Sequence, residues 1–215
     1  MNIAVEIATD DKFDQVLSTT LLAFCADPFV RWAINDSYQY LTRYSELFKA
    51  SIKTAISNQT AYAATGFSGV AVWFSPGIYA EDQDIVTAIQ NLGPCPLKDL
   101  MEESFEKFLS YHPQEDHWYM PFMGVEPSFQ GQGIGSALLK HSLKECDRTQ
   151  HLAYLEASSE RNVAFYERHG FRVIGKFQVG NSPQLFPMIR EPIASYEVCL
   201  LYTSPSPRDP RGSRM

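Results

Sequence analysis

The stretch that most constrains how this chain can fold is residues 117–147, where an apolar segment runs into a glycine-rich turn and then an amphipathic pattern. The apolar segment, HWYMPFMGV, is typical of a strand buried inside a sheet. The turn that follows contains Gly131, Gly133 and Gly135. A strand, a tight turn and a helix in this order leave free backbone N–H groups where an anion can bind. Because glycine has no Cβ, a phosphate can approach this backbone closely, and we interpret the turn as a pyrophosphate site.

Strands and helices alternate through the second half of the chain, whereas the first half opens with a pair of adjacent strands. The hydrophobic pattern predicts strands at 2–8, 60–65, 68–74, 117–125, 152–157, 171–178 and 185–190, helices at 13–24, 38–57, 133–147 and 160–169, and two helical pieces within 81–111. We expect the strand at 185–190 to lie at an edge of the sheet. Helical crossovers imply some parallel pairing, so the predicted fold class is α+β with a mixed sheet.

Length and composition indicate a single domain over residues 1–202. A chain of 215 residues can bury one sizeable core. Residues 203–215, TSPSPRDPRGSRM, consist mainly of Pro, Ser and Arg and cannot bury enough surface to order themselves. We therefore expect a disordered tail there, which is a candidate for a segment foreign to the domain.

The same composition argues against several classes of partner. The net charge is −7 and the body of the chain has no basic cluster, so we expect no nucleic-acid partner. An acidic body instead attracts a cationic amine. We find no apolar run long enough for a membrane span and no signal-peptide layout, and we expect a cytoplasmic protein. The four cysteines are far apart, which predicts reduced thiols and no metal site.

A second motif is SERNVAFYERHGF, residues 159–171. Asn162 and Tyr166 are four positions apart and therefore project from one face of a helix. Gly170 would end this helix in a left-handed conformation and allow Phe171 to fold back near Tyr166.

The spacing Gln130-x-x-Gly133-x-Gly135, followed by Asn162 and Tyr166, resembles the GCN5-related N-acetyltransferase (GNAT) family. Together with VAVWFSPG, the sequence is similar to the puromycin N-acetyltransferase group within it. The resemblance implies a mostly antiparallel twisted sheet flanked by helices, with a splayed strand pair that binds acyl-CoA. It also implies an acetyl-CoA-dependent N-acetyltransferase that acts, in a ternary complex, on the amine of a small molecule such as a puromycin-like aminonucleoside.

The resemblance assigns roles to particular residues. The residues it implies for cofactor binding are Met123, Gly124, Val125, Gln130, Gly131, Gln132, Gly133, Ile134, Gly135, Ser136, Asn162, Phe165 and Tyr166. A backbone N–H of Gly124 or Val125 would stabilise the oxyanion, and the Tyr166 hydroxyl would protonate the leaving thiolate.

The general base has two candidates. Glu156 ends one strand and could face the acceptor amine, whereas His117 opens another strand and could act through water. Pro121 cannot donate a ladder hydrogen bond, so it marks either a bulge or a point where the strand separates from its neighbour.

Two other functions stay open. In a dinucleotide fingerprint, G-x-G-x-x-G, the third glycine would stand at Ser136, although Glu156 follows Gly135 at about the distance of a ribose-binding acid. Only one complete strand–helix–strand unit follows, which is too little for a doubly wound sheet. A non-catalytic acyl-CoA-binding module is the other alternative, and the presence of Tyr166 and Asn162 argues against it.

Overall fold

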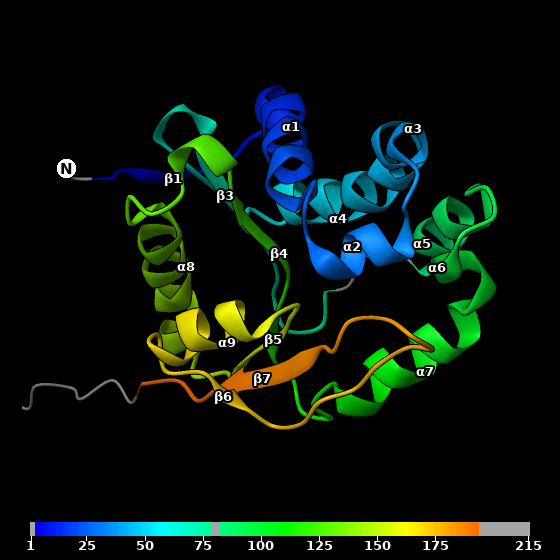
Figure 1. The fold of residues 1–215 in the computed structure, drawn as a ribbon. Helices are drawn as coiled ribbons and strands as arrows, with labels where there is room; N and C mark the ends of the chain where they lie inside the picture. The colour runs from blue at the N-terminus through cyan, green and yellow to red at the C-terminus, as the bar shows by residue number, and fades with distance from the viewer. Residues whose placement is uncertain (1–2, 79–81, 194–215) are drawn as a thin grey trace, which may run out of the picture.

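The computed structural model describes residues 3–78 and 82–193. At its centre is one seven-stranded sheet with the strand order β1-β2-β3-β4-β5-β7-β6 (Figure 1). The strands are β1 (Val5–Ile7), β2 (Ala61–Ala64), β3 (Gly69–Phe74), β4 (Trp118–Val125), β5 (Ala153–Ala157), β6 (Arg172–Val173) and β7 (Phe186–Arg190). Strands β4 and β5 pair in parallel, and the other described neighbours pair antiparallel. The predicted mixed, mostly antiparallel sheet is therefore confirmed.

Helices cover both faces of this sheet. They are α1 (Phe13–Phe24), α2 (Pro28–Ala33), α3 (Ser37–Gln39), α4 (Ser45–Ser57), α5 (Asp82–Gln90), α6 (Pro96–Asp99), α7 (Met101–Tyr111), α8 (Ile134–Thr149) and α9 (Glu160–Glu167), with a π-helical turn at Tyr40–Tyr44 and 3₁₀ turns at Asp10–Lys12, Thr65–Phe67 and Pro127–Phe129. Helices α1 and α4 lie on one side of β4, and α8 and α9 lie on the other (Figure 1). None of the described helices is long and apolar enough to cross a membrane.

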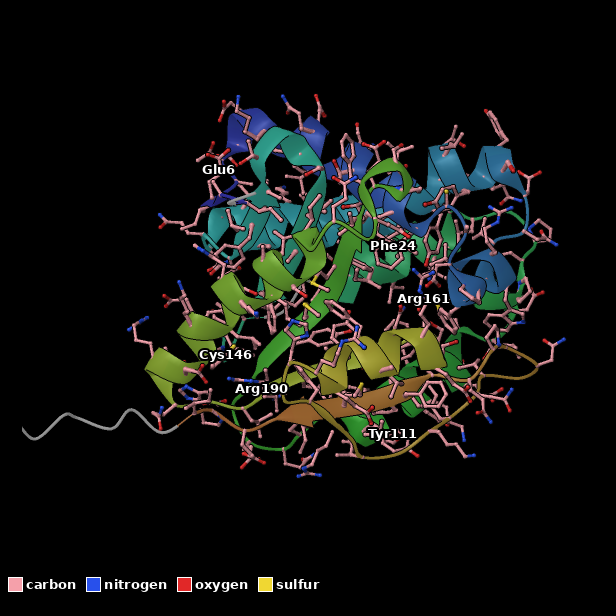
Figure 2. The ribbon with its side chains drawn as sticks, turned by 60° about the vertical axis from the view of Figure 1, so that its left-hand side comes forward. Glu6, Phe24, Tyr111, Cys146, Arg161 and Arg190 are labelled. Carbon is pink, nitrogen blue, oxygen red and sulfur yellow. The ribbon has the colours of Figure 1, made fainter. Side chains whose placement is uncertain are left out.

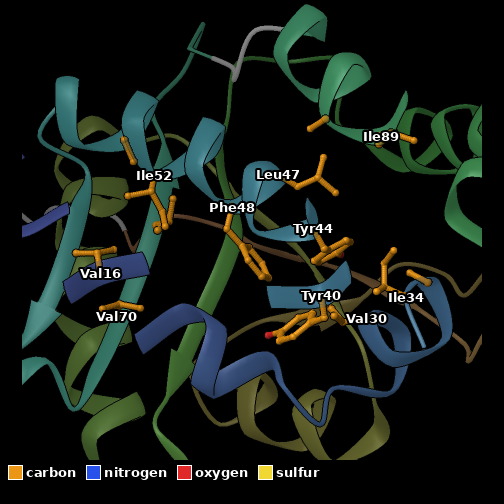
Figure 3. Packing of buried hydrophobic residues seen from close by; sticks show 14 of the residues in the cluster. Val16, Val30, Ile34, Tyr40, Tyr44, Leu47, Phe48, Ile52, Val70 and Ile89 are labelled. Carbon is orange, nitrogen blue, oxygen red and sulfur yellow. The ribbon is translucent and has the colours of Figure 1, made fainter. Parts of the chain in front are cut away.

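The alternation of side chains along the strands divides the core into two clusters. The cluster on the α1–α4 face takes alternate residues of β2 and β3, namely Ala61, Ala63, Val70, Val72 and Phe74. Figure 3 shows Val16, Phe48, Ile52 and Val70 packed together in this cluster. The cluster on the α8–α9 face takes the intervening residues, Tyr62, Ala64, Ala71 and Trp73. Each strand residue of this central hairpin is therefore buried against one layer of helices or the other.

The alternation slips by one residue at Pro121 in β4. On β3, Val72 pairs with Phe122 and Phe74 pairs with Tyr119, so two residues of β4 lie opposite a single residue of β3. Such a β-bulge leaves a residue out of the ladder, and proline has no N–H to contribute there. The bulge that we considered for Pro121 is therefore confirmed.

The separation that we also considered for Pro121 occurs at the same place. Strands β4 and β5 are paired at Trp118 with Ala153 and at Tyr119 with Tyr154. Beyond Tyr119, β4 continues to Val125 alongside β3 and has no pairing to β5 in the described part of the chain. The two parallel strands thus diverge where the bulge begins, and the predicted splayed pair is present.

Two predictions about the end of the sheet are wrong. The strand at Phe186–Arg190 lies between β5 and β6 and is not an edge, and β6 has only the residues Arg172–Val173. The chain leaves the sheet after β6 because its next segment packs on α7. Gly175 lies so close to the ring of Tyr111 that a Cβ would collide with it, and Gly180 approaches Leu100 in the same way. Figure 2 labels Tyr111 among the side chains of this region.

The bounds of two other elements differ slightly from those predicted from the sequence. Strand β1 is shorter than the predicted strand at 2–8, and the helix predicted at 38–57 is divided by the π-helical turn. The proposed tail at 203–215 lies outside the described residues, and the single-domain boundary at residue 202 stays a prediction.

Candidate functional site

The glycine turn before α8 has the backbone geometry of an anion site. Gly131 and Gly133 have φ values of +77° and +83°, a region that glycine adopts at no steric cost. Gly133 is the N-cap of α8 and has no side chain that could accept hydrogen bonds from the first N–H groups of the helix. The first backbone hydrogen bond of α8 runs from Ala137 N to Gly133 O at 3.0 Å. The N–H groups of residues 134–136 therefore point out of the helix end, where the dipole favours negative charge. A Cβ on Gly131 would meet nothing within 4 Å, so the space beside the turn is open.

The other predicted residues of the turn have structural tasks. The Gln130 side chain donates to the Val125 carbonyl at 3.2 Å and ties the turn to the end of β4. A Cβ on Gly135 would lie 3.4 Å from the Phe165 ring, so this glycine allows α9 to approach the first turn of α8. Gly135 therefore has a packing role beside α9, and its part in phosphate binding stays a prediction.

Strand β4 directs alternate N–H groups to its two sides. The Glu126 N–H donates to the Ser68 carbonyl on the β3 side at 3.0 Å. Gly124, two residues earlier, therefore points its N–H toward β3 as well. The N–H groups of Met123 and Val125 point the opposite way, to the side from which β5 has diverged.

This alternation separates the two predicted oxyanion donors. Val125 is suitably oriented, and Met123 is a second candidate, whereas the prediction for Gly124 is wrong because its N–H belongs to the β3 ladder. The absence of a side chain at Gly124 has a different reason: a Cβ there would collide with Ala23 of α1. Gly124 thus allows α1 to approach the sheet.

Helix α9 presents Asn162 and Tyr166 as predicted. The helix is capped by Ser159, whose hydroxyl accepts from the Asn162 N–H at 3.3 Å. At its other end Gly170 has φ +88°, Phe171 N donates to the Tyr166 carbonyl, and the Phe171 and Tyr166 rings lie 5.7 Å apart. The predicted left-handed C-cap is confirmed.

The Tyr166 hydroxyl is held in its protonated form. The side chain is buried, and this burial, with a further contribution from the Asp27 carboxylate, raises the pKa of Tyr166 above its usual value. A phenol that keeps its proton at neutral pH can donate that proton to a leaving group. The raised pKa keeps the hydroxyl protonated but makes it a weaker acid than a free phenol, so it first donates a hydrogen bond, which can become proton transfer as charge develops on the leaving group.

Asp27 is a residue of this region that the sequence analysis missed. Its Oδ1 accepts from the N–H groups of Phe29 and Val30, both at 3.0 Å, and so caps α2. Its Oδ2 accepts from the Ser158 hydroxyl at 2.5 Å, and Ser158 in turn accepts from Asn162 Nδ2 at 3.2 Å. Burial raises the pKa of Asp27 despite these hydrogen bonds. An Asp followed by Pro signals a helix N-cap, but no local pattern reveals its contact with Ser158.

Glu156 lies on β5 two residues beyond the last parallel pair with β4, at the diverging end. Its side chain is only 6% exposed. Oε2 accepts from the Tyr119 hydroxyl at 3.1 Å, and Oε1 lies 3.5 Å from Nε2 of His112. Oε1 has no hydrogen-bond partner among the described residues. It is therefore a buried carboxylate oxygen with a lone pair available for a proton.

His117 lies at the closed end of the strand pair, just before β4. Its Nδ1 is 2.8 Å from the Glu115 carbonyl, which can only accept, so Nδ1 carries a proton. Burial lowers the pKa of His117 and keeps the imidazole neutral. Its distance along the strand from the diverging end makes it less suitable than Glu156 as the residue that meets the acceptor.

Together these groups can bind an anion, stabilise a developing oxyanion, donate a proton and accept one. The described residues contain no group of three or more His, Cys, Asp or Glu side chains that could hold a metal ion. The residues described above supply general acid–base and electrostatic contributions.

Comparisons with known proteins agree with this arrangement. The model of the acetyltransferase (GNAT) domain family matches residues 101–173, which contain α7, the diverging strands and both motifs. An uncharacterized N-acetyltransferase of Schizosaccharomyces pombe is 25% identical over 200 residues, which is 84% of this chain and 80% of the relative.

Solved structures of acetyltransferases share the fold. A structure described as histone acetyltransferase HPA2 and related acetyltransferase, from Corynebacterium glutamicum, has a TM-score of 0.64 and 25% identity, covering 91% of this chain and 99% of the other. Arylalkylamine N-acetyltransferase 2 from Aedes aegypti has a TM-score of 0.67 at 17% identity, covering 89% of this chain and 99% of that chain.

Proposed function

This chain belongs to the GNAT acetyltransferases, and on that premise we propose that it moves an acetyl group from acetyl-CoA to the amine of a small molecule, with both substrates bound at once. The observation that carries the proposal is the divergence of β4 from β5 beside the glycine turn of α8. The free N–H groups at residues 134–136 suit the pyrophosphate, and the open space beside Gly131 admits it. The outward N–H groups of Met123 and Val125 suit the amide-bearing arm.

When bound, acetyl-CoA supplies the acetyl group as an activated thioester. The protein supplies three further contributions. A backbone N–H of Val125 or Met123 stabilises the charge that develops on the carbonyl oxygen. Glu156 accepts the proton of the attacking ammonium, which would otherwise stay largely protonated at neutral pH. The Tyr166 hydroxyl donates its proton to the departing sulfur.

We assign the base to Glu156 in preference to Asp27 because of their hydrogen bonds. Both oxygens of Asp27 already accept, from two backbone N–H groups and the Ser158 hydroxyl. Oε1 of Glu156 has no hydrogen-bond partner among the described residues, and the carboxylate is buried at the diverging end. A free lone pair at the right end of the strand is what a base requires.

The charge of the chain and the side chains around Glu156 indicate the class of acceptor. The chain is acidic, and the aromatic side chains of Tyr119 and Tyr154 lie beside Glu156. Such a site suits a cationic amine on an apolar or aromatic body. Puromycin-like aminonucleosides and arylalkylamines both have this character, and the name of the Aedes protein gives the second class added weight.

A thiol-release assay with a panel of amines tests the proposal. The panel should hold arylalkylamines, polyamines, puromycin-like aminonucleosides and peptides, with acetyl-CoA as donor. We expect release above the hydrolysis background with at least one amine, and a loss of about 10²-fold or more in Glu156→Gln. This loss should be greatest at low pH and smaller as the pH approaches the pKa of the amine, where the substrate arrives neutral.

Two results would change the assignment. Tight CoA binding without turnover on any amine would identify a non-catalytic acyl-CoA-binding module. A large loss of turnover in Asp27→Asn, with Glu156→Gln active, would transfer the base role to Asp27.

A further inference from the structure

We propose that His112, the C-cap residue that follows α7, carries the proton from Glu156 to solvent. The inference rests on the proposed function, because it concerns the proton that Glu156 would receive from the amine. Glu156 is 6% exposed, so it needs a second group to return to its ionised form between turnovers. His112 has no part in either sequence motif and comes from the helical segment before β4.

The geometry places His112 between Glu156 and the surface. Its Nε2 lies 3.5 Å from Oε1 of Glu156, and its side chain is 19% exposed. Its ring also packs on two neighbouring rings, with centroids 4.7 Å from Tyr119 and 4.5 Å from Tyr154. The close contact of Gly175 with Tyr111 anchors the adjoining end of α7. His112 is therefore held against Glu156 by fixed neighbours.

The other titratable groups in this cluster are poorly suited to the task. Burial raises the pKa of Tyr119 well above its usual value and raises that of Tyr154 as well, so both hydroxyls keep their protons. His117, whose ring lies 5.5 Å from that of His112, is 3% exposed and has its pKa lowered by burial. Tyr119 also contacts Glu156 and is partly exposed, but its phenol keeps its proton, so His112 is the described neighbour that can exchange a proton between Glu156 and solvent.

Unpartnered polar atoms support a proton path here. Oε1 of Glu156, the Tyr154 hydroxyl and Nε2 of His117 are buried and have no hydrogen-bond partner among the described residues. Buried polar groups are normally paired, and an unpaired cluster is costly unless it serves a ligand or a proton transfer. Three such atoms in one cluster, one of them on the carboxylate itself, mark a site built for exchange of protons or water.

The transfer is balanced in protons and leaves the heavy-atom bonds unchanged. The ammonium nitrogen first gives one proton to Oε1 of Glu156, which frees its lone pair for attack. A second proton leaves the nitrogen as the amide forms and replaces the one that Tyr166 gives to the sulfur. Glu156 then passes the first proton to Nε2 of His112, and the resulting imidazolium releases its Nδ1 proton to bulk water. Glu156 is ionised again, and His112 is neutral with its remaining proton on Nε2. Exchange of that proton to Nδ1 through water restores the free lone pair of Nε2 before the next turnover.

Chemical rescue of His112→Ala is the first test. We expect kcat to fall about 10- to 100-fold, toward the lower end of what acid–base groups contribute, with KM for both substrates within about twofold. Added imidazole should restore much of the lost kcat, because the vacated position is open to solvent. His112→Gln should show the same loss without rescue, since no space is left. His141→Gln, on the surface of α8, is the matched control and should keep normal kcat.

A kcat that stays near the wild-type value in His112→Ala, or one that falls without any response to imidazole, would overturn the proposal and leave the acetyltransferase function intact. Wild-type protein that acetylates no amine would instead refute the proposed function, and the proton path with it.

Carbethoxylation followed by mass spectrometry is a test that needs no turnover. We expect diethyl pyrocarbonate to modify His112 in the folded protein and to leave His117 unmodified. Protection of His112 at reagent concentrations that modify His141 would show that the path to solvent is closed.

Discussion

The glycine turn allows a prediction with an internal control, because two glycines share one backbone conformation. Gly131 has φ +77° and Gly77, in the turn after β3, has φ +76°. A Cβ at either position would meet nothing within 4 Å. An alanine in this left-handed region costs about 1–2 kcal/mol. Gly131→Ala and Gly77→Ala should therefore lose similar amounts of unfolding free energy.

Only Gly131→Ala places a methyl group where the pyrophosphate would approach. A hydrogen bond to a charged group is worth about 1.5–3 kcal/mol. Loss of one such bond weakens CoA binding by about 10- to 150-fold. Gly77→Ala should bind CoA with the wild-type affinity, because it lies in a different turn.

Calorimetric titration with CoA, together with the melting temperature of each variant, measures both effects. Equal CoA affinity in the two folded variants would refute the pyrophosphate site. Gly133→Val is a less informative change, because Gly133 is the N-cap of α8 with φ +83° and a β-branched residue would strain the helix start itself.

Three other variants have defined outcomes. Tyr166→Phe keeps the ring but removes the proton donor, so turnover should fall about 10²-fold with CoA affinity within twofold, and turnover near the wild-type value would make Tyr166 a packing residue. The buried Arg190 guanidinium donates to the two carboxylate oxygens of Asp147 at 2.8 and 3.0 Å, and Asp147→Asn removes this charge partner. Urea unfolding should show that the free energy of unfolding falls by about 2–3 kcal/mol. The loss is smaller than for fully buried pairs because the Asp147 side chain is 26% exposed. Burial opposes ionisation of Asp147, but Arg190 holds the pKa of this carboxyl below its usual value. The pair therefore stabilises the fold fully above about pH 4, and this stabilisation is lost as the pH falls through the folded pKa. The stability of Asp147→Asn should accordingly depend less on pH in that range. Burial raises the pKa of Asp27, so the contribution of its protonated form to the stability of the fold is lost as the pH rises through the folded pKa. Asp27→Asn keeps an N-cap acceptor and should therefore not lower the melting temperature at pH 7.

The features that the sequence predicted are those encoded in short stretches. The glycines before α8, the helical spacing of Asn162 and Tyr166, and the left-handed turn at Gly170 each depend on neighbours within a few residues. Pro121 also signalled a local event, although sequence alone left a bulge and a strand separation as alternatives. The structure has both, because the residue that leaves the β3 ladder is next to the last pair with β5.

The features that the sequence did not predict depend on contacts between distant segments. Strand β7 lies between β5 and β6, and this position depends on the neighbouring strands and not on the local sequence of β7. Asp27 meets Ser158 from 131 positions away, and His112, which follows α7, meets Glu156 of β5. A periodicity or a cap signal cannot identify such partners. The orientation of the β4 N–H groups was out of reach for the same reason, since it follows from the register with β3.

The part of β4 from Pro121 to Val125 lies in the middle of the sheet, but its side toward β5 is unpaired among the described residues, as in an edge strand. Edge strands expose a row of backbone N–H and C=O groups and are templates for an added strand. Groups on the same side recur about every 6.6–6.8 Å, so an extended molecule with amides at a matching separation can dock as a short strand would. Ligand binding would then complete the sheet. The liganded protein should show slower hydrogen exchange at Met123 and Val125, and less self-association on heating, than the protein alone.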